Sequence, residues 1–487
     1  MAFIESVQYS PGVKVREIDL SAYAPLYAPV FIGIVGTAKK GFTDKLNFVG
    51  NVYQMFETLG KPRPADYGLW ATYYALRAGA SVYFARVVGA GAHKAQAVAV
   101  DENNEPCLTL SAVSEGDWGN ELSVVISKLS DTSYRLKVLY DNRVVHSYDY
   151  VSTDVNSPYH LSKLLENSEY VRVVSATGQA PKSQTVAFTG GADGATPTST
   201  DVLNALRLFS NREEVDVDTI TAPGWFTDDV VSQLITIVET RKDSIAIIDP
   251  PPSLSPLQVK DWVNGVGLSR PALNTSYGAL YYPWLKIVDE FGGGSIWVPP
   301  SVGVLYAITN NDFYGSHFAP AGLKRGKLPF VIGVERKLTL GDRELLQSPD
   351  ARVNPIIDNP KFGAVVWGQK TLQVAPTALD RLNVRRYLIQ LEKSLASLAM
   401  NFIFEPNTPS TRKLFVQEAI KILEYSKQIE AISSYTIQCD EQVNPPTLVD
   451  NNIMRAVITV VPVKSAERIW IDVVLTGSQG VQFNVSA

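Results

Sequence analysis

The chain has 487 residues, of which 45% are hydrophobic and 19% are charged, and its formal net charge is −5. This length suggests about three domains, and the negative charge leaves no large basic field for holding nucleic acid. Two distant cysteines, Cys107 and Cys439, are too few for a disulfide framework. We find no signal peptide and no apolar run near the ~20 residues that span a bilayer, so we expect assembly in the cytoplasm.

The N-terminal stretch predicts a strand without a neighbouring partner. Ser10-Pro11-Gly12 is a turn signal, and apolar and charged residues alternate after it, as in a half-buried strand. An irregular connector follows over residues 19–29. The strand must therefore pair with a distant segment, either in its own chain or in another. The residues of this strand are Val13, Lys14, Val15, Arg16, Glu17 and Ile18.

Residues 30–88 predict a β-α-α-β unit. Residues 30–35 are continuously apolar, which is typical of a buried strand. Val52, Phe56 and Leu59 mark one helical face, and residues 69–76 mark a second helix. A further strand is expected over residues 81–88, and the pattern indicates an α/β start.

The middle of the chain changes character twice. Residues 98–195 contain short alternating segments between turns, which predict a β-rich insertion with one short helix near 161–166. The α/β pattern returns over residues 196–365, with a helix at 230–239 and a buried strand at 244–249. Strand ends are expected at 280–284 and 296–300, where proline and glycine also indicate long loops.

The C-terminal part is the most periodic. Apolar residues at 388, 391, 395, 398 and 402 predict a long amphipathic helix, and 415, 419 and 422 mark another. Three alternating strands are expected near 435–439, 456–461 and 469–475. The last of these is the segment Ile469, Trp470, Ile471, Asp472, Val473, Val474 and Leu475.

Candidate catalytic and metal-binding patterns are weak. Residues 33–41 are rich in glycine and lysine, but they lack the spacing and the hydroxyl residue of a phosphate loop. The four histidines have no metal-ligand spacing. Asp249, Asp289, Glu290 and Asp312 lie near expected strand ends, where active sites of α/β folds occur. Turn-capping or solvated acids are the simpler interpretation, so we expect no enzyme, cofactor or metal.

Short motifs along about 430 residues resemble the tail sheath proteins of contractile phages. The closing part matches best, in Val366-Trp367-Gly368, Asn383-Val384-Arg385-Arg386 and Phe404-Glu405-Pro406-Asn407. Two local departures are Ser316-His317 and Gln369-Lys370, where the family has other residues. The remaining matches are at residues 10–13, 16–19, 33–36, 40–41, 249–251, 282–284, 298–301, 311–312, 315, 319–322, 371–372, 439–441 and 444–445.

The resemblance implies a mixed α/β, multi-domain fold. Its expected parts are an N-terminal arm (1–20), a discontinuous core module (21–97 with 366–462), a β-rich outward insertion (98–195), a central α/β domain (196–365) and a C-terminal strand and tail (463–487). Both terminal strands would then add to sheets in neighbouring subunits. Folding back into their own sheet is the alternative, which the residues alone leave open.

The resemblance also implies a function and partners. Copies would form six-fold rings, stacked helically around a tail tube, and would contact baseplate and tail terminator proteins within the virion. Contraction would drive the tube through the host envelope. Bacteriocin-like particles and other contractile injection systems use the same type of subunit, and an α/β hydrolase using Asp249 or Asp312 is a distant alternative. Arg381, Arg385, Arg386 and Lys393 are candidates to face the tube.

Overall fold

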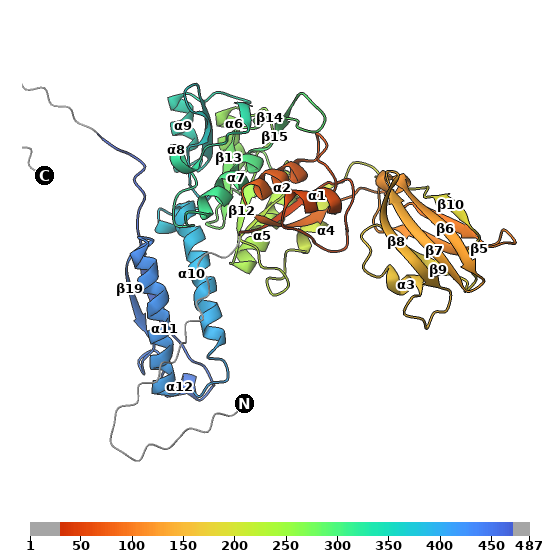
Figure 1. Ribbon diagram of the computed structural model, residues 1–487. Coiled ribbons are helices and arrows are strands. Elements are labelled where there is room, and N and C mark those ends of the chain that lie inside the picture. The colour runs from red at the N-terminus through yellow and green to blue at the C-terminus, as the bar shows by residue number, and fades with distance from the viewer. Residues whose placement is uncertain (1–29, 471–487) are drawn as a thin grey trace, which may run out of the picture.

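An eight-stranded sheet organises the main body of the chain in the computed structural model, which describes residues 30–470 (Figure 1). Its order in space is β18-β17-β13-β12-β11-β1-β3-β2. The six inner strands are parallel, and the edge strands β2 and β18 pair antiparallel with their neighbours. The strands are β1 (Phe31–Gly36), β2 (Asn47–Val49), β3 (Ser81–Arg86), β11 (Thr219–Thr221), β12 (Ile245–Ile248), β13 (Gly278–Tyr282), β17 (Asn354–Asn359) and β18 (Gly363–Val366).

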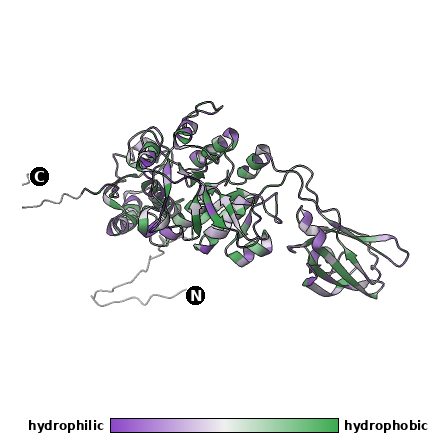
Figure 2. Cartoon of the chain, turned by 90° about the horizontal axis from the view of Figure 1, so that it is seen from above, coloured by the Kyte–Doolittle hydropathy of each residue, from purple (hydrophilic) through white to green (hydrophobic). Residues whose placement is uncertain are grey.

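Helices cover both faces of this sheet. Side chains alternate along each strand, so Ile34 of β1 packs with α2 and α7, whereas Val35 packs with α4 and α5. The strands at the centre of the body accordingly carry mostly hydrophobic residues (Figure 2). One face is covered by α1 (Val52–Thr58), α2 (Tyr67–Arg77) and α7 (Pro300–Asp312), and the other by α4 (Ser199–Arg207), α5 (Asp228–Arg241), α6 (Pro256–Val263) and α9 (Leu340–Leu346).

Gly36, the last residue of β1, allows α2 to pack closely on the strand. A Cβ atom placed on Gly36 would lie 2.8 Å from Cα of Gly68 in α2, which is too short for any larger residue without backbone movement. The body also contains a small sheet and a short helix. These are β14 (Leu285–Val288), β15 (Ser295–Val298), β16 (Val331–Val334) and α8 (Gly322–Arg325).

Residues 30–86 belong to this body, whereas the expected core module of 21–97 with 366–462 groups them with the C-terminal part of the chain. Strand β1 pairs with β11, and β3 pairs with β1, so residues 30–86 complete the same sheet as the strands of 219–366. The reason is that parallel pairing is set by contacts distant in sequence, which short-range patterns do not report. The expectation of a mixed α/β, multi-domain fold is confirmed.

A β-rich module projects from the body (Figure 1). Its two sheets have the orders β10-β6-β7-β8 and β4-β5-β9. They enclose a separate hydrophobic core that includes Trp118, Val124 and Leu136. Its elements are β4 (Gln96–Val100), β5 (Pro106–Ala112), η1 (Asp117–Glu121), β6 (Leu122–Ser130), β7 (Ser133–Tyr140), β8 (Arg143–Ser152), α3 (Leu161–Leu164), β9 (Val171–Ala176) and β10 (Gln184–Ala187).

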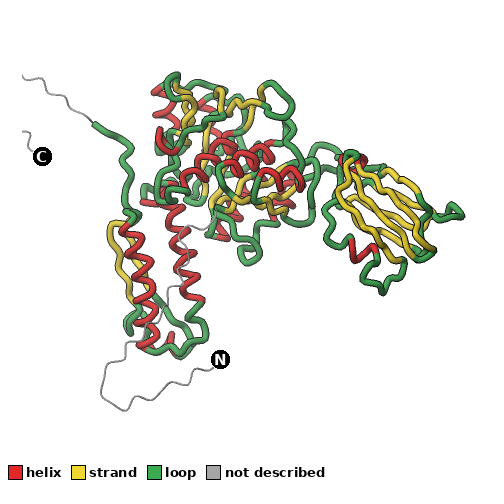
Figure 3. Tube along the Cα trace, in the orientation of Figure 1, coloured by secondary structure: helices red, strands yellow, loops and turns green. Residues whose placement is uncertain are grey.

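A third part, here named the C-terminal module, extends away from the body as two long helices side by side (Figure 3). A two-stranded sheet lies along α11. Helix α11 begins with Thr408, whose hydroxyl accepts from the Thr411 amide, and with Pro409 at the first helical position. The module contains α10 (Leu382–Met400), α11 (Pro409–Gln428), β19 (Ile432–Gln438), α12 (Pro446–Val449) and β20 (Val457–Pro462), and η2 (Ala378–Asp380) precedes it.

Candidate functional site

The acids at the ends of the body strands do not form an active-site pair. Asp249 accepts hydrogen bonds from the backbone amide and hydroxyl of Ser301 at 2.8 and 2.6 Å, which caps the N-terminus of α7. Asp312 lies at the other end of the same helix and pairs with Arg386. Thirteen helical residues separate the two ends by about 20 Å. Burial raises the pKa of Asp249 to about 6 and also raises the pKa of Asp312.

The other two acids have structural partners as well. Asp289 accepts from the amides of Phe291 and Gly292 and closes a turn. Glu290 accepts from the Tyr73 hydroxyl at 2.7 Å. Within residues 30–470, no group of three His, Cys, Asp or Glu side chains could hold a metal ion. The same stretch has no helix long and apolar enough to cross a bilayer.

The glycine- and lysine-rich loop after β1 lies in the body and contacts the β-rich module through Lys40. The ammonium group of Lys40 lies 4.9 Å from the ring centre of Tyr140, 5.2 Å from Tyr170 and 5.9 Å from Trp118. These distances are typical of cation–π contacts, and burial lowers the pKa of Lys40. The lysine is thus enclosed by aromatic rings and is not presented to a phosphate.

Two of the four candidate tube-facing residues are buried, and that prediction is wrong for them. Arg385 is 7% exposed and donates to the Ser276 hydroxyl at 2.7 Å. Arg386 is 6% exposed and forms its ion pair with Asp312. Both lie on the face of α10 that packs on the body. Burying their charges is costly, and the buried acid and the hydroxyl that they contact compensate this cost.

The other two candidates also bind within the chain. Lys393 contacts Asp216 and Asp218 at 2.6 and 2.8 Å. Arg381, just before α10, donates to both carboxylate oxygens of Glu467 at 2.7 and 2.8 Å. The four basic residues therefore attach α10 and the C-terminal segment to the body.

The two-stranded sheet of the C-terminal module is covered on one face only. Tyr435 pairs with Val460, and Ile437 pairs with Ile458, and these four side chains pack on α10 and α11. Residues between them, such as Thr436, point outward and are exposed. Among the described residues β19 pairs with β20 alone, so each strand has one outer edge without a partner strand. Such edges present backbone donors and acceptors that another strand can complete.

The segment that follows β20 leads away from the module. Residues 463–470 have no regular secondary structure, and the side chains of Ile469 and Trp470 are 79% and 87% exposed. Glu467 is the attachment point of this segment, because its carboxylate binds Arg381 and also accepts from Gln369 at 3.1 Å. After β20 the chain runs out from the C-terminal module (Figure 1).

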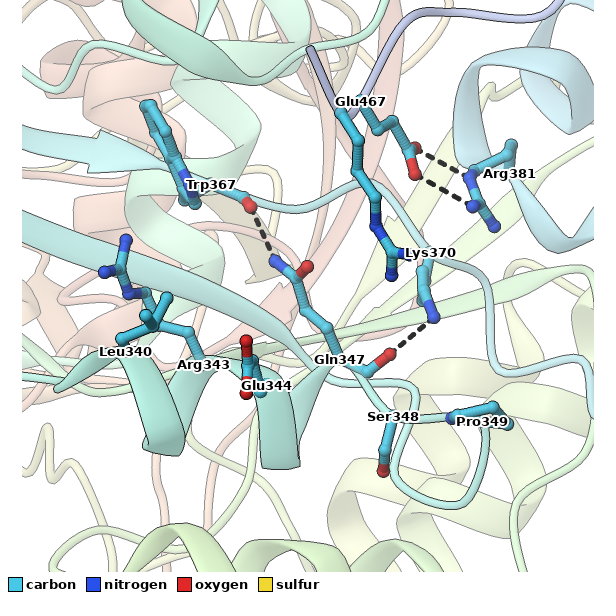
Figure 4. A pocket seen from close by; sticks show the side chains of 11 residues that line it. Leu340, Arg343, Glu344, Gln347, Ser348, Pro349, Trp367, Lys370, Arg381 and Glu467 are labelled. Carbon is cyan, nitrogen blue, oxygen red and sulfur yellow. Dashed lines mark hydrogen bonds and ion pairs between the residues drawn. The ribbon is translucent and has the colours of Figure 1, made fainter. Parts of the chain in front are cut away.

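A hollow of about 1000 Å³ lies beside this attachment point (Figure 4). One wall is α9, another is the chain after β18 with Trp367 and Lys370, and the third is formed by Arg381 and Glu467. Two of the walls are hydrogen-bonded to each other, because the Gln347 side-chain amide donates to the Trp367 carbonyl at 2.7 Å. Glu467 and Arg468 of the outgoing segment therefore also line the hollow.

The two predicted terminal strands lie mostly outside the described residues. Val13, Lys14, Val15, Arg16, Glu17 and Ile18 lie outside the described residues, as do Ile471, Asp472, Val473, Val474 and Leu475. Ile469 and Trp470 are described and are not in a strand of their own chain. Sequence reasoning missed Glu467 and the hollow, because no local pattern links residue 467 to residues 343–381.

Comparison with known proteins identifies the C-terminal module first. Residues 374–476 match the phage tail sheath C-terminal domain, so this part of the chain is a domain of that class. The chain is 26% identical over 344 residues to the tail sheath protein of Enterobacteria phage T4, a match that covers 65% of this chain and 50% of the relative. The tail sheath protein of Vibrio phage KVP40 is 24% identical over 351 residues, with 67% and 52% covered. The chain is similar to these tail sheath proteins over about two thirds of its length, and it spans about half the length of these curated relatives.

Solved structures agree on the fold. The sheath tail protein from Listeria innocua matches with a TM-score of 0.63 at 12% identity, covering 89% of this chain and 95% of the other. The sheath of an extracellular contractile injection system, in its contracted state, matches with a TM-score of 0.56 at 15% identity and 98% and 99% coverage. The sheath fold therefore extends over nearly the whole chain.

Proposed function

We propose that this chain is a structural, non-enzymatic sheath subunit. Copies polymerise around a tail tube as hexameric rings stacked helically, and the sheath contracts from a metastable extended state to a stable contracted state. Contraction drives the tube through the host envelope for genome ejection. The observation that carries this proposal is the sheet β19–β20, which has two edges without a partner strand within residues 30–470, beside an outgoing, exposed segment.

Strand donation is the link between subunits in this proposal. The N-terminal strand over residues 13–18 and the C-terminal strand over 469–475 add to the open edges of β19 and β20 in neighbouring copies. Five or six ladder bonds, at about 0.5–1.5 kcal/mol net each, give several kcal/mol per strand. Contacts of this head-to-tail kind do not close on themselves, so they generate helical filaments.

Contraction is a change of packing between rigid bodies that keep these links. Helix α10 is fixed to the body by Arg385, Arg386 and Lys393, so body and C-terminal module move together. The exposed segment 463–467 bends when neighbouring subunits change their relative orientation. The work comes from surface newly buried between copies, and no nucleotide is required.

Partners and location follow from this role. The tail tube protein lies inside the sheath, baseplate proteins anchor one end, and a tail terminator closes the other. The subunit is a component of the virion tail or of a tail-like particle, assembled in the host cytoplasm. A bacteriocin or another injection system is the alternative setting, and DNA in the purified particle distinguishes a phage from these.

Deletion of residues 1–20 tests the strand-donation step. We expect the shortened protein to remain folded and to lose the ability to form sheaths or long tubes in negative-stain micrographs. Deletion of residues 1–8 is the matched control, because it keeps residues 13–18, and it should still polymerise. Sheaths formed by the protein without residues 1–20 would contradict strand donation.

A further inference from the structure

The hollow beside the outgoing segment carries an excess of positive charge. Arg343, Lys370 and Arg468 line it, and none of them has an ion-pair partner in the part of the chain that the structure describes. Glu344 is the one lining acid without such a partner there. Arg381 is already neutralised by Glu467. The hollow thus offers two more uncompensated positive charges than negative ones.

The shape of the hollow suits a polypeptide segment. Its volume of about 1000 Å³ lies at the upper end of the range typical of ligand pockets, and it is open to the surface. Trp367 is 39% exposed and Leu340 is 64% exposed, so apolar surface lies between the cations. An apolar surface with charged groups around it is the usual anatomy of a protein–protein contact.

The position of the hollow points to a second copy as its occupant. The outgoing segment lines the hollow through Glu467 and Arg468. The strand proposed to pair with another copy begins at Ile469, directly after these two residues. A copy that receives this strand therefore lies close to the hollow, and each copy carries a net charge of −5. Burial lowers the pKa of Lys370, with Arg381 as the next cause, which is consistent with cationic surroundings.

We propose that this hollow receives an acidic surface segment of a second copy of the chain, the same copy that takes the outgoing C-terminal strand. The inference rests on the proposed function, because it requires copies linked by the terminal strands. It adds a charged contact beside the backbone contact. The strand supplies affinity through hydrogen bonds, and the charged contact fixes the angle at which the neighbouring copy sits.

Charge reversal tests the proposal in the full chain. We expect Arg343→Glu with Arg468→Glu to raise the critical concentration for polymerisation at least about tenfold, measured by light scattering and electron microscopy. The difference from the unchanged chain should shrink at high salt, since exposed charges are screened. The matched control is Lys137→Glu with Arg143→Glu, which makes the same charge change on exposed residues of the β-rich module. Equal critical concentrations for the two double variants would overturn the proposal.

A cross-linking measurement covers the case in which the variant fails to fold. A photoreactive amino acid at position 343 in the assembled particle should cross-link to an Asp- or Glu-containing peptide of another copy, identified by mass spectrometry. Cross-links only within the same copy, or to a different protein, would overturn the proposal. If the unchanged chain forms no sheath at all, the proposed function fails. If it forms sheaths but position 343 gives no contact between copies, only this inference fails.

Discussion

The body sheet and the C-terminal sheet differ in how far each is covered by other parts of the same chain. The body sheet has eight strands, helices on both faces and two antiparallel edge strands. The C-terminal sheet has two strands and helices on one face, and in the described part of the chain neither strand has a partner at its outer edge. A two-stranded sheet is marginal alone, so α10 and α11 must support it. The body covers both faces of its sheet within one chain, whereas the C-terminal sheet leaves one face exposed beside its two edge strands.

The joint between the two regions should be the most sensitive to mutation. Asp312→Ala leaves the guanidinium of Arg386 buried without its partner, and we expect a loss of about 3–5 kcal/mol in the free energy of unfolding. Chemical denaturation of the unassembled protein measures this loss. The double variant Asp312→Leu with Arg386→Met is the control and should recover most of it. A loss below about 1 kcal/mol for the single variant would mean that the joint is not held by this pair.

Matched truncations in the two sheets should differ in size. Ile34 in β1 is fully buried, so Ile34→Ala should cost about 2–5 kcal/mol of unfolding free energy. Val461 in β20 is 49% exposed, so Val461→Ala should change stability by no more than about 0.5 kcal/mol in the unassembled protein. Denaturant titration of both variants measures the contrast. Similar losses at both positions would show that the outer face of the C-terminal sheet is already covered within one chain.

A small effect on stability is also expected at the attachment of the outgoing segment. Glu467→Gln removes the ion pair with Arg381, which is partly exposed, so the loss should be below about 1 kcal/mol. Amide hydrogen exchange over residues 463–468 should nevertheless become faster, because the segment loses its main contact. Glu424→Gln, which removes an exposed hydrogen-bonding acid elsewhere, is the control. Unchanged exchange in Glu467→Gln would show that the segment is held by other contacts.

Local patterns predicted most helices with an apolar stripe and the strands with a continuous apolar run. The helices around 52–59, 69–76, 230–239 and 388–402 are present, as are the strands around 30–35 and 244–249. Helix α7 was missed because most of its residues are buried, so its sequence shows no apolar stripe. Its proline start at Pro299-Pro300 resembles the end of a strand in sequence.

The attachments of α10 could not be predicted for a different reason. Charged residues on a helix are normally exposed, so Arg385 and Arg386 were expected to face a partner. Their true neighbours, Ser276 and Asp312, lie 109 and 74 residues away in sequence. Pairing over such separations is decided by the tertiary fold, and the same holds for the hollow and for Glu467.

The two chain segments that connect the body to the β-rich module run beside each other, which makes the module replaceable by another domain. His93 donates its backbone amide to the Ala192 carbonyl at 3.0 Å, and Ala195 donates to Ala90 at 2.9 Å. Chain entry and chain exit are therefore fastened together before the module begins. A foreign domain whose ends lie equally close can replace residues 96–187 and leave the body strands in register. This makes the position a natural graft site for displaying new binding domains.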